Sequence, residues 1–66
     1  MSAREKAYWR NTRLVLEGRL SGYEIVPDKK YLDMWRVRRP DGSESDMANR
    51  ARAKDAAYDM LDRDLR

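Results

Sequence analysis

Apolar and polar residues alternate with two different periods along this chain, and each period predicts a different kind of element. Across residues 3–17 the apolar side chains recur at helical spacing, which predicts a first helix. Gly18 fits the left-handed position that commonly follows a helix. The short apolar run 14–16 also fits a strand over residues 12–17, so a strand competes with the helix in this segment.

The middle of the chain predicts three strands. Residues 23–26 alternate as a half-buried strand, and residues 34–39 form a second one after a loop. Pro40-Asp41-Gly42 predicts a tight turn, because proline presets φ at one corner and glycine accepts positive φ. A third strand over 43–48 would pair back across that turn, although its composition is poor for a strand.

From residue 49 or 50 onward the spacing is helical again, with Asn49 as the expected N-cap. The predicted apolar stripe of this helix consists of Ala53, Ala56, Ala57, Met60, Leu61 and Leu65. It should pack on a core that also contains Tyr23, Ile25, Trp35 and Val37 from the strands, and Leu14 and Val15 from the first helix. The predicted fold class is therefore α+β. The element order is α-β-β-β-α, a three-stranded antiparallel sheet with two helices packed on one face, in a single domain over residues 1–66.

Composition narrows the function classes. With 66 residues, no cysteine and no histidine, the chain has no disulfide and no zinc-finger ligands. Neither a nucleophile–base pair nor a glycine-rich phosphate loop is present, so we expect a non-enzyme without a cofactor. No apolar run reaches the length of about 18 residues that a membrane span needs. The amino terminus also lacks the apolar stretch of a signal peptide, so we expect a cytoplasmic protein and no membrane partner.

Charge supplies the main functional hypothesis. The chain has fifteen Lys and Arg residues and twelve Asp and Glu residues, which gives a net charge of +3. Three cations open the last helix, where the helix dipole favours anions, so an external phosphate would complete the site. The candidate phosphate-binding residues are Lys29 and Lys30 on the loop, Arg50, Arg52 and Lys54 on the last helix, and Arg10 and Arg13 in support on the first helix. A solvated, non-functional surface is the competing interpretation of each group.

The last helix also resembles part of a known family. The stretch Arg50-Ala51-Arg52-Ala53-Lys54 looks like the Lys-Lys-x-Ala-Lys stretch that opens the last helix of the double-stranded-RNA-binding domain. That resemblance, together with the α-β-β-β-α order, implies phosphate contacts across a major groove of duplex RNA. The loop over residues 27–32 differs from the Gly-Pro-x-His loop with which that family reads the minor groove.

A second resemblance covers the carboxy-terminal half. A set of segments in this half is similar to short, uncharacterised proteins of bacteria and their prophages: Met34-Trp35-Arg36-Val37-Arg38, Pro40-Asp41-Gly42, Ser45-Asp46-Met47, Asn49 and Arg52-Ala53-Lys54-Asp55-Ala56-Ala57. This resemblance implies a small mobile-element or accessory protein and carries no activity with it.

Two other surfaces are candidates. Arg36 and Arg38 alternate outward on a predicted strand, as in phage-integrase-like sheets that enter a major groove, unless Glu24, Glu44 and Asp46 neutralise them. Trp9 and Tyr31 are candidate stacking platforms for bases. The alternative function is a protein–protein interaction module, a phage-type adaptor or inhibitor, that presents the sheet face or an acidic helix to a protein partner or to a second copy. The acidic residues of that helix are Asp55, Asp59, Asp62 and Asp64.

The nucleic-acid hypothesis, in which the partner is an RNA or DNA duplex, depends on one arrangement. The lysine-bearing loop and the start of the last helix must open on the same side of the molecule. It depends equally on a coiled, not extended, amino-terminal third, which carries the supporting cations.

Overall fold

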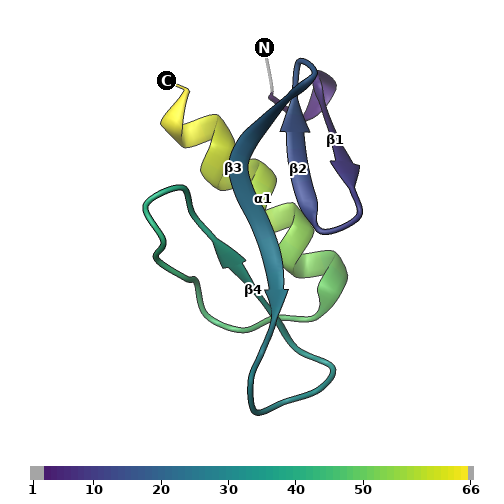
Figure 1. Ribbon diagram of the computed structural model, residues 1–66, viewed down its shortest axis with the longest axis vertical. Coiled ribbons are helices and arrows are strands. Elements are labelled where there is room, and N and C mark those ends of the chain that lie inside the picture. Colours follow the sequence, from purple (N-terminus) through teal and green to yellow (C-terminus); the bar gives the residue numbers. More distant parts are fainter. Residues whose placement is uncertain (1–2, 66) are drawn as a thin grey trace.

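The chain runs back and forth as an antiparallel sheet before it ends in a helix that crosses one face of that sheet (Figure 1). The computed structural model describes residues 3–65. Within them lie a short 3-10 turn Ala3–Glu5, strands β1 (Ala7–Arg10), β2 (Arg13–Leu16), β3 (Arg19–Pro27) and β4 (Trp35–Arg38), and helix α1 (Arg50–Asp64). The strand order is β1-β2-β3-β4, and each strand is antiparallel to the next.

The predicted first helix over residues 3–17 is wrong, because this segment forms the hairpin β1–β2. Two two-residue turns decide the outcome. Asn11, between β1 and β2, has φ 57°, and Glu17 and Gly18, between β2 and β3, have φ 51° and 80°. Glu17-Gly18 has the positive φ at both central residues that a type I′ turn requires, and the Asn11-Thr12 turn has it at the first central residue, as in a type II′ turn. The twist of both turn types matches antiparallel strands. The strand predicted over 12–17 is therefore the correct interpretation, and β2 occupies residues 13–16.

The predicted fold class is consequently wrong in its element order. The described residues form four strands and one α-helix, so α1 alone covers the inner face of the sheet. The sequence Ser2-Ala3-Arg4-Glu5 also predicts a capping box at the start of the predicted first helix, and Ser2 lies outside the described residues. The expected role of Gly18 as a helix terminator is also wrong, although its positive φ was anticipated.

The pairing of β2 with β3 is irregular next to Leu14, where the register shifts. Residues 21–23 of β3 lie opposite the single residue Leu14 of β2. The hydroxyl of Ser21 satisfies two backbone groups there: it donates to the Leu14 carbonyl at 2.7 Å and accepts from the Tyr23 N–H at 3.2 Å. Leu14 is fully buried in the core on the inner face, whereas Val15 is buried outside that core cluster.

The expected strand 34–39 is confirmed as β4, and the turn after it is also confirmed. The Gly42 N–H donates to the Arg39 carbonyl at 2.9 Å, and Gly42 has φ 90°. The third predicted strand, 43–48, is wrong. That segment returns beside β4 but makes only isolated bridges, at Glu44 and at Ala48. The Ser45 hydroxyl, rather than a backbone carbonyl, accepts the Val37 N–H at 2.9 Å, so no regular ladder forms.

Helix α1 closes the core as its stripe predicts. Asn49 caps it, and Ala53, Ala57 and Leu61 are buried against the sheet. The core cluster contains Leu14, Tyr23, Ile25, Val37, Ala53, Ala57 and Leu61. The prediction is wrong for Leu65, which is 59% exposed at the helix end.

Candidate nucleic-acid interface

The start of α1 carries cations without a carboxylate in its first turn. The Asn49 Oδ1 accepts a hydrogen bond from the Arg52 N–H at 2.9 Å and so satisfies one of the free amides. Arg50, Arg52 and Lys54 add three positive side chains where the helix dipole is already positive. No acidic side chain within this turn balances that charge.

Two of these cations rest on tryptophan rings that the sheet supplies. The Arg50 guanidinium lies 4.9 Å from the centroid of Trp35, and the Lys54 ammonium lies 5.2 Å from the centroid of Trp9. The negative face of an aromatic ring attracts a cation, which explains how the helix start tolerates these residues. The contact fixes each side chain but leaves its charge in place, so an anion can still approach it.

The β3–β4 loop is organised around Asp28. Its Oδ2 accepts from the backbone N–H groups of Lys30 and Tyr31, both at 2.9 Å, and its Oδ1 accepts from Arg36 Nε at 2.8 Å. The Tyr31 N–H, the Arg36 guanidinium and the Lys30 N–H together lower the pKa of Asp28 from 3.8 to about 2. One ionised carboxylate thus holds the backbone that presents both loop lysines.

We expect Asp28→Asn to destabilise the fold at neutral pH and to have little effect as the pH approaches 2. The pKa of Asp28 is depressed in the folded state, so its stabilisation is complete above 3.8 and is lost as the pH falls towards about 2. Urea unfolding of both proteins across this pH range measures the difference. Asp33→Asn is the control, because Asp33 makes no hydrogen bond or ion pair with the described residues. A gap between wild type and Asp28→Asn that stays constant with pH would contradict this role.

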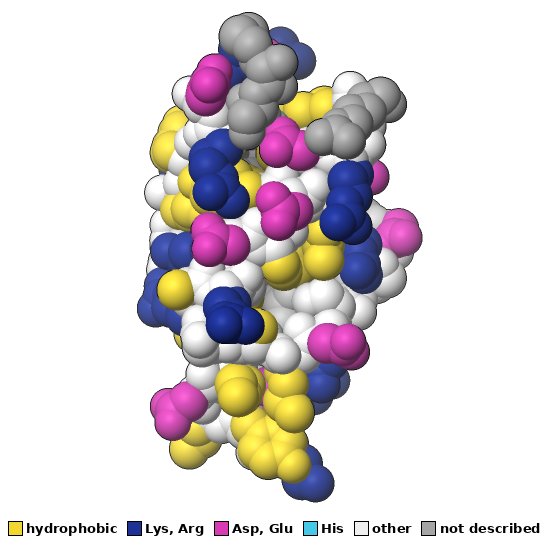
Figure 2. Space-filling model, turned by 180° about the vertical axis from the view of Figure 1, so that it is seen from behind, with side chains coloured by type: hydrophobic (Ala, Val, Ile, Leu, Met, Phe, Trp, Pro, Cys, Tyr) yellow, Lys and Arg dark blue, Asp and Glu magenta, His cyan; other side chains and the backbone are white. Residues whose placement is uncertain are grey.

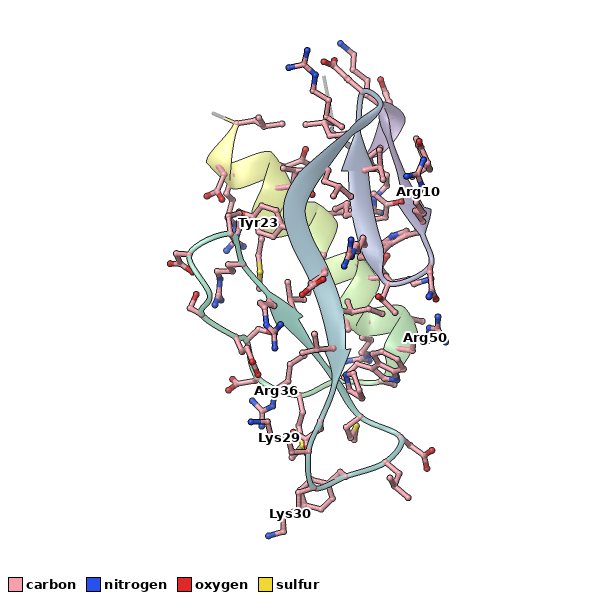
Figure 3. All side chains as sticks on the ribbon, in the orientation of Figure 1. Arg10, Tyr23, Lys29, Lys30, Arg36 and Arg50 are labelled. Atoms are coloured by element: carbon pink, nitrogen blue, oxygen red, sulfur yellow. The ribbon has the colours of Figure 1, made fainter. Side chains whose placement is uncertain are left out.

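Trp35 connects the loop to the start of α1. It pairs with Pro27 at the end of the β3–β4 ladder. Its N–H also donates to the Ala48 carbonyl at 2.7 Å, and its carbonyl accepts from the Ala48 N–H at 2.8 Å. Figure 3 shows Lys30 at the tip of the loop and Arg50 at the start of α1, both in the lower half of the view. Lys30 and Arg50 therefore lie in the same half of the molecule along its long axis.

The predicted position of Arg10 and Arg13 on a helix is wrong, because they flank the β1–β2 turn. Arg10 is exposed and makes no ion pair with any described residue, whereas Arg13 Nε lies 3.7 Å from Glu24 Oε2. Arg10 follows Trp9, the ring beneath Lys54, and Figure 3 shows Arg10 on the same side of the view as Arg50. Of these two residues, only Arg10 presents charge that no carboxylate neutralises.

The outer face of the sheet is a charge-compensated surface. Arg38 lies 3.2 Å from Glu24 and 3.4 Å from Glu44, and the loop carboxylate described above holds Arg36. The expectation that acidic neighbours neutralise these arginines is confirmed for Glu24 and Glu44. Asp46, the third expected partner, makes no ion pair within residues 3–65. This face therefore offers an approaching polyanion little free positive charge.

Most of the phosphate-binding candidates, unlike the arginines of the outer face, have no carboxylate partner within residues 3–65. Six of the seven make no ion pair with a carboxylate of the described residues: Lys29, Lys30, Arg50, Arg52, Lys54 and Arg10. Their charge is unneutralised within the part of the chain that the structure describes, although the chain as a whole carries nearly as many acids as bases. We call these six residues the basic site.

The two candidate stacking residues lie in different environments. Trp9 is partly buried and packs edge-on against Tyr58, with ring centroids 6.0 Å apart and an interplanar angle of 79°. Tyr31 is 48% exposed on the loop. Trp9 therefore supports Lys54 and is not an open platform, whereas the Tyr31 ring is accessible.

Sequence reasoning missed Asp28 and the two tryptophan supports. Asp28 has a local signal, since an aspartate at the start of a loop often accepts from N–H groups two and three residues later. Trp35 was assigned to the core, and no local pattern indicates that Arg50 lies over it.

No family model, curated protein or solved structure matches this chain. The described residues contain no group of three or more acidic side chains placed to hold a metal ion. None of their helices has the length and apolar character that crossing a bilayer requires.

Proposed function

We propose that this protein binds double-stranded nucleic acid without catalysing a reaction, by neutralising backbone phosphates with the basic site. The observation that carries the proposal is the contrast between two sets of cations on one chain. Carboxylates at 2.8–3.4 Å neutralise the arginines of the outer sheet face, whereas the six cations of the basic site have no such partner among the described residues. A cation that neutralises a phosphate releases counterions from the duplex, and a cation already paired with a carboxylate must first give up that partner.

Local structure also favours phosphate binding over a merely solvated surface. Arg50 and Lys54 are held on tryptophan rings, and Lys30 lies 5.6 Å from the centroid of Tyr31. Side chains that are already ordered lose less conformational entropy when a ligand binds them. With about four phosphates neutralised, the logarithm of the binding constant should fall against the logarithm of salt concentration with a slope of about −3.

Three double charge reversals test the proposal at matched net charge. The variants are Lys29→Glu/Lys30→Glu on the loop, Arg50→Glu/Arg52→Glu on the helix, and the control Arg19→Glu/Arg63→Glu. Arg19 and Arg63 also lack ion-pair partners in residues 3–65, and Arg63 is in the last turn of α1. We expect each site variant to bind a short duplex at least about tenfold more weakly than the control, with a salt slope smaller by about 2.

Fluorescence anisotropy with labelled duplex DNA and duplex RNA, over a series of salt concentrations, measures both quantities. Circular dichroism of each variant confirms that the fold is retained. Equal losses in all three variants would attribute binding to net charge alone and would reject the basic site. No binding of either duplex at low salt would reject the function itself.

A further inference from the structure

The β3–β4 loop ends in an apolar tip. Leu32 is 93% exposed, the highest value among the large hydrophobic residues of the described chain, and its neighbour Tyr31 is 48% exposed. Figure 2 shows hydrophobic side chains gathered at the end of the molecule that holds this loop. Leaving a leucine in water forgoes the stabilisation of burying it, so an exposed apolar tip suggests an external surface that covers it.

The tip is held away from the body of the protein by the loop's own hydrogen bonds. The Asp28 carboxylate binds the N–H groups of Lys30 and Tyr31. The Asp28 N–H donates to the Met34 carbonyl at 2.8 Å, and the Met34 N–H donates to the Tyr31 carbonyl at 3.1 Å. Leu32 therefore projects from a closed, hydrogen-bonded loop.

We infer that Leu32, supported by Tyr31, acts as a wedge that enters the minor groove of double-stranded DNA and opens one base step. The inference rests on the proposed function and names its ligand class. Apolar side chains that insert between base steps unstack them and bend the duplex, which then contacts more protein surface. Lys29 and Lys30, directly before the tip, would meet the phosphates that border the groove.

The shape of the minor groove favours DNA over duplex RNA, and the positions of the cations favour DNA over an anionic membrane. The minor groove of B-DNA is narrow, about 6 Å, and confines an inserted side chain, whereas that of A-form RNA is wide and shallow. Figure 3 shows Arg10 and Arg50 away from the tip, and the other two cations of the basic site, Arg52 and Lys54, belong with Arg50 to α1, in a molecule with extents of 35 × 20 × 17 Å. Cations spread along the length of the protein suit a rod-shaped polyanion better than the flat surface of an anionic membrane.

The decisive measurement is DNA bending. A duplex of about 20 base pairs with a donor and an acceptor dye at its ends reports its end-to-end distance by energy transfer, because so short a duplex is stiff when free. We expect saturating wild-type protein to raise the transfer efficiency and Leu32→Ser to abolish that rise. Leu20→Ser is the matched control, since Leu20 is also exposed, at 57%, but lies on β3 outside the loop. It should bend the duplex like wild type.

Affinity and salt dependence separate the wedge from the basic site. Leu32→Ser should weaken DNA binding about tenfold, the effect of leaving one leucine unburied, with an unchanged salt slope. Binding of DNA without bending, or bending by Leu32→Ser equal to that of wild type, would overturn the wedge and leave the proposed function intact. Failure to bind any duplex would remove both. Sedimentation with phosphatidylglycerol vesicles that depends on Leu32, together with unbent DNA, would instead assign the tip to a membrane surface.

Discussion

Gly22→Ala is expected to lower the free energy of unfolding by about 3 kcal/mol, from left-handed backbone strain combined with a steric clash. Gly22 has φ 91° in the irregular part of β3, and a Cβ there would lie 2.8 Å from Cγ and 3.0 Å from Cβ of Pro40. The proline ring is rigid and cannot turn away. In a domain of this size such a loss removes much of the total stability. Chemical denaturation measures it.

Two other glycines separate the strain from the clash. Gly18 and Gly42 have φ 80° and 90°, and a Cβ at either position would meet no atom within 4 Å. Gly18→Ala and Gly42→Ala should therefore lower the free energy of unfolding only through backbone strain, by about 1 kcal/mol each. In the background Pro40→Ala, the effect of Gly22→Ala should fall towards that value. Equal losses at all three glycines would show that the contact with Pro40 is unimportant.

Leu14→Ala is expected to lower the free energy of unfolding by about 3 kcal/mol, because it leaves a cavity in the core. Leu14 is 0% exposed and packs between the sheet and α1. Leu20→Ala removes the same atoms from a residue that is 57% exposed, so its effect should stay below about 0.5 kcal/mol. Urea unfolding monitored by tryptophan fluorescence compares the two.

Arg10 offers a test of the corrected fold. Thr substituted for the exposed Arg10 should leave stability nearly unchanged, because β-branched residues suit strands and disfavour helices. A clear loss of stability from Arg10→Thr would contradict the β1–β2 hairpin.

The carboxy-terminal half was predictable because its signals are local and agree with one another. The Asn49 cap and the alanine spacing that follows it define α1, and the hydrogen bond from the Arg52 N–H to Asn49 confirms the cap. Alternation placed Val37 and Ile25 on the inner face, where both are buried. The prediction failed for the return segment 43–48, where a serine side chain replaces a backbone partner, and for Leu65, which is exposed at the helix end.

The amino-terminal third was mispredicted because its apolar residues fit both periods. Leu14 and Val15 are adjacent and both buried, a pattern that a helix explains with one face. In the structure they are buried on opposite sides of β2, so the pattern has no single face. The available signal was turn chemistry, namely two short turns with positive φ at Asn11 and at Glu17-Gly18.

The basic site was predictable as a set of cations but not as a set of free cations. Whether an arginine keeps its charge depends on partners far away in the chain, such as Glu24, which is 14 residues before Arg38. Spacing along the sequence gives no measure of such pairs. The three-dimensional structure alone separates Arg38, which is neutralised, from Arg50, which lies over Trp35.

Helix α1 follows all four strands along the chain, and this order affects how the protein is made. Each strand pairs with its neighbour in sequence, so the hairpins can form as the chain leaves the ribosome. The inner face of the sheet has no cover until the residues after Asn49 have emerged. During synthesis the nascent sheet therefore exposes Leu14, Ile25 and Val37 to chaperones or to other chains until α1 has emerged.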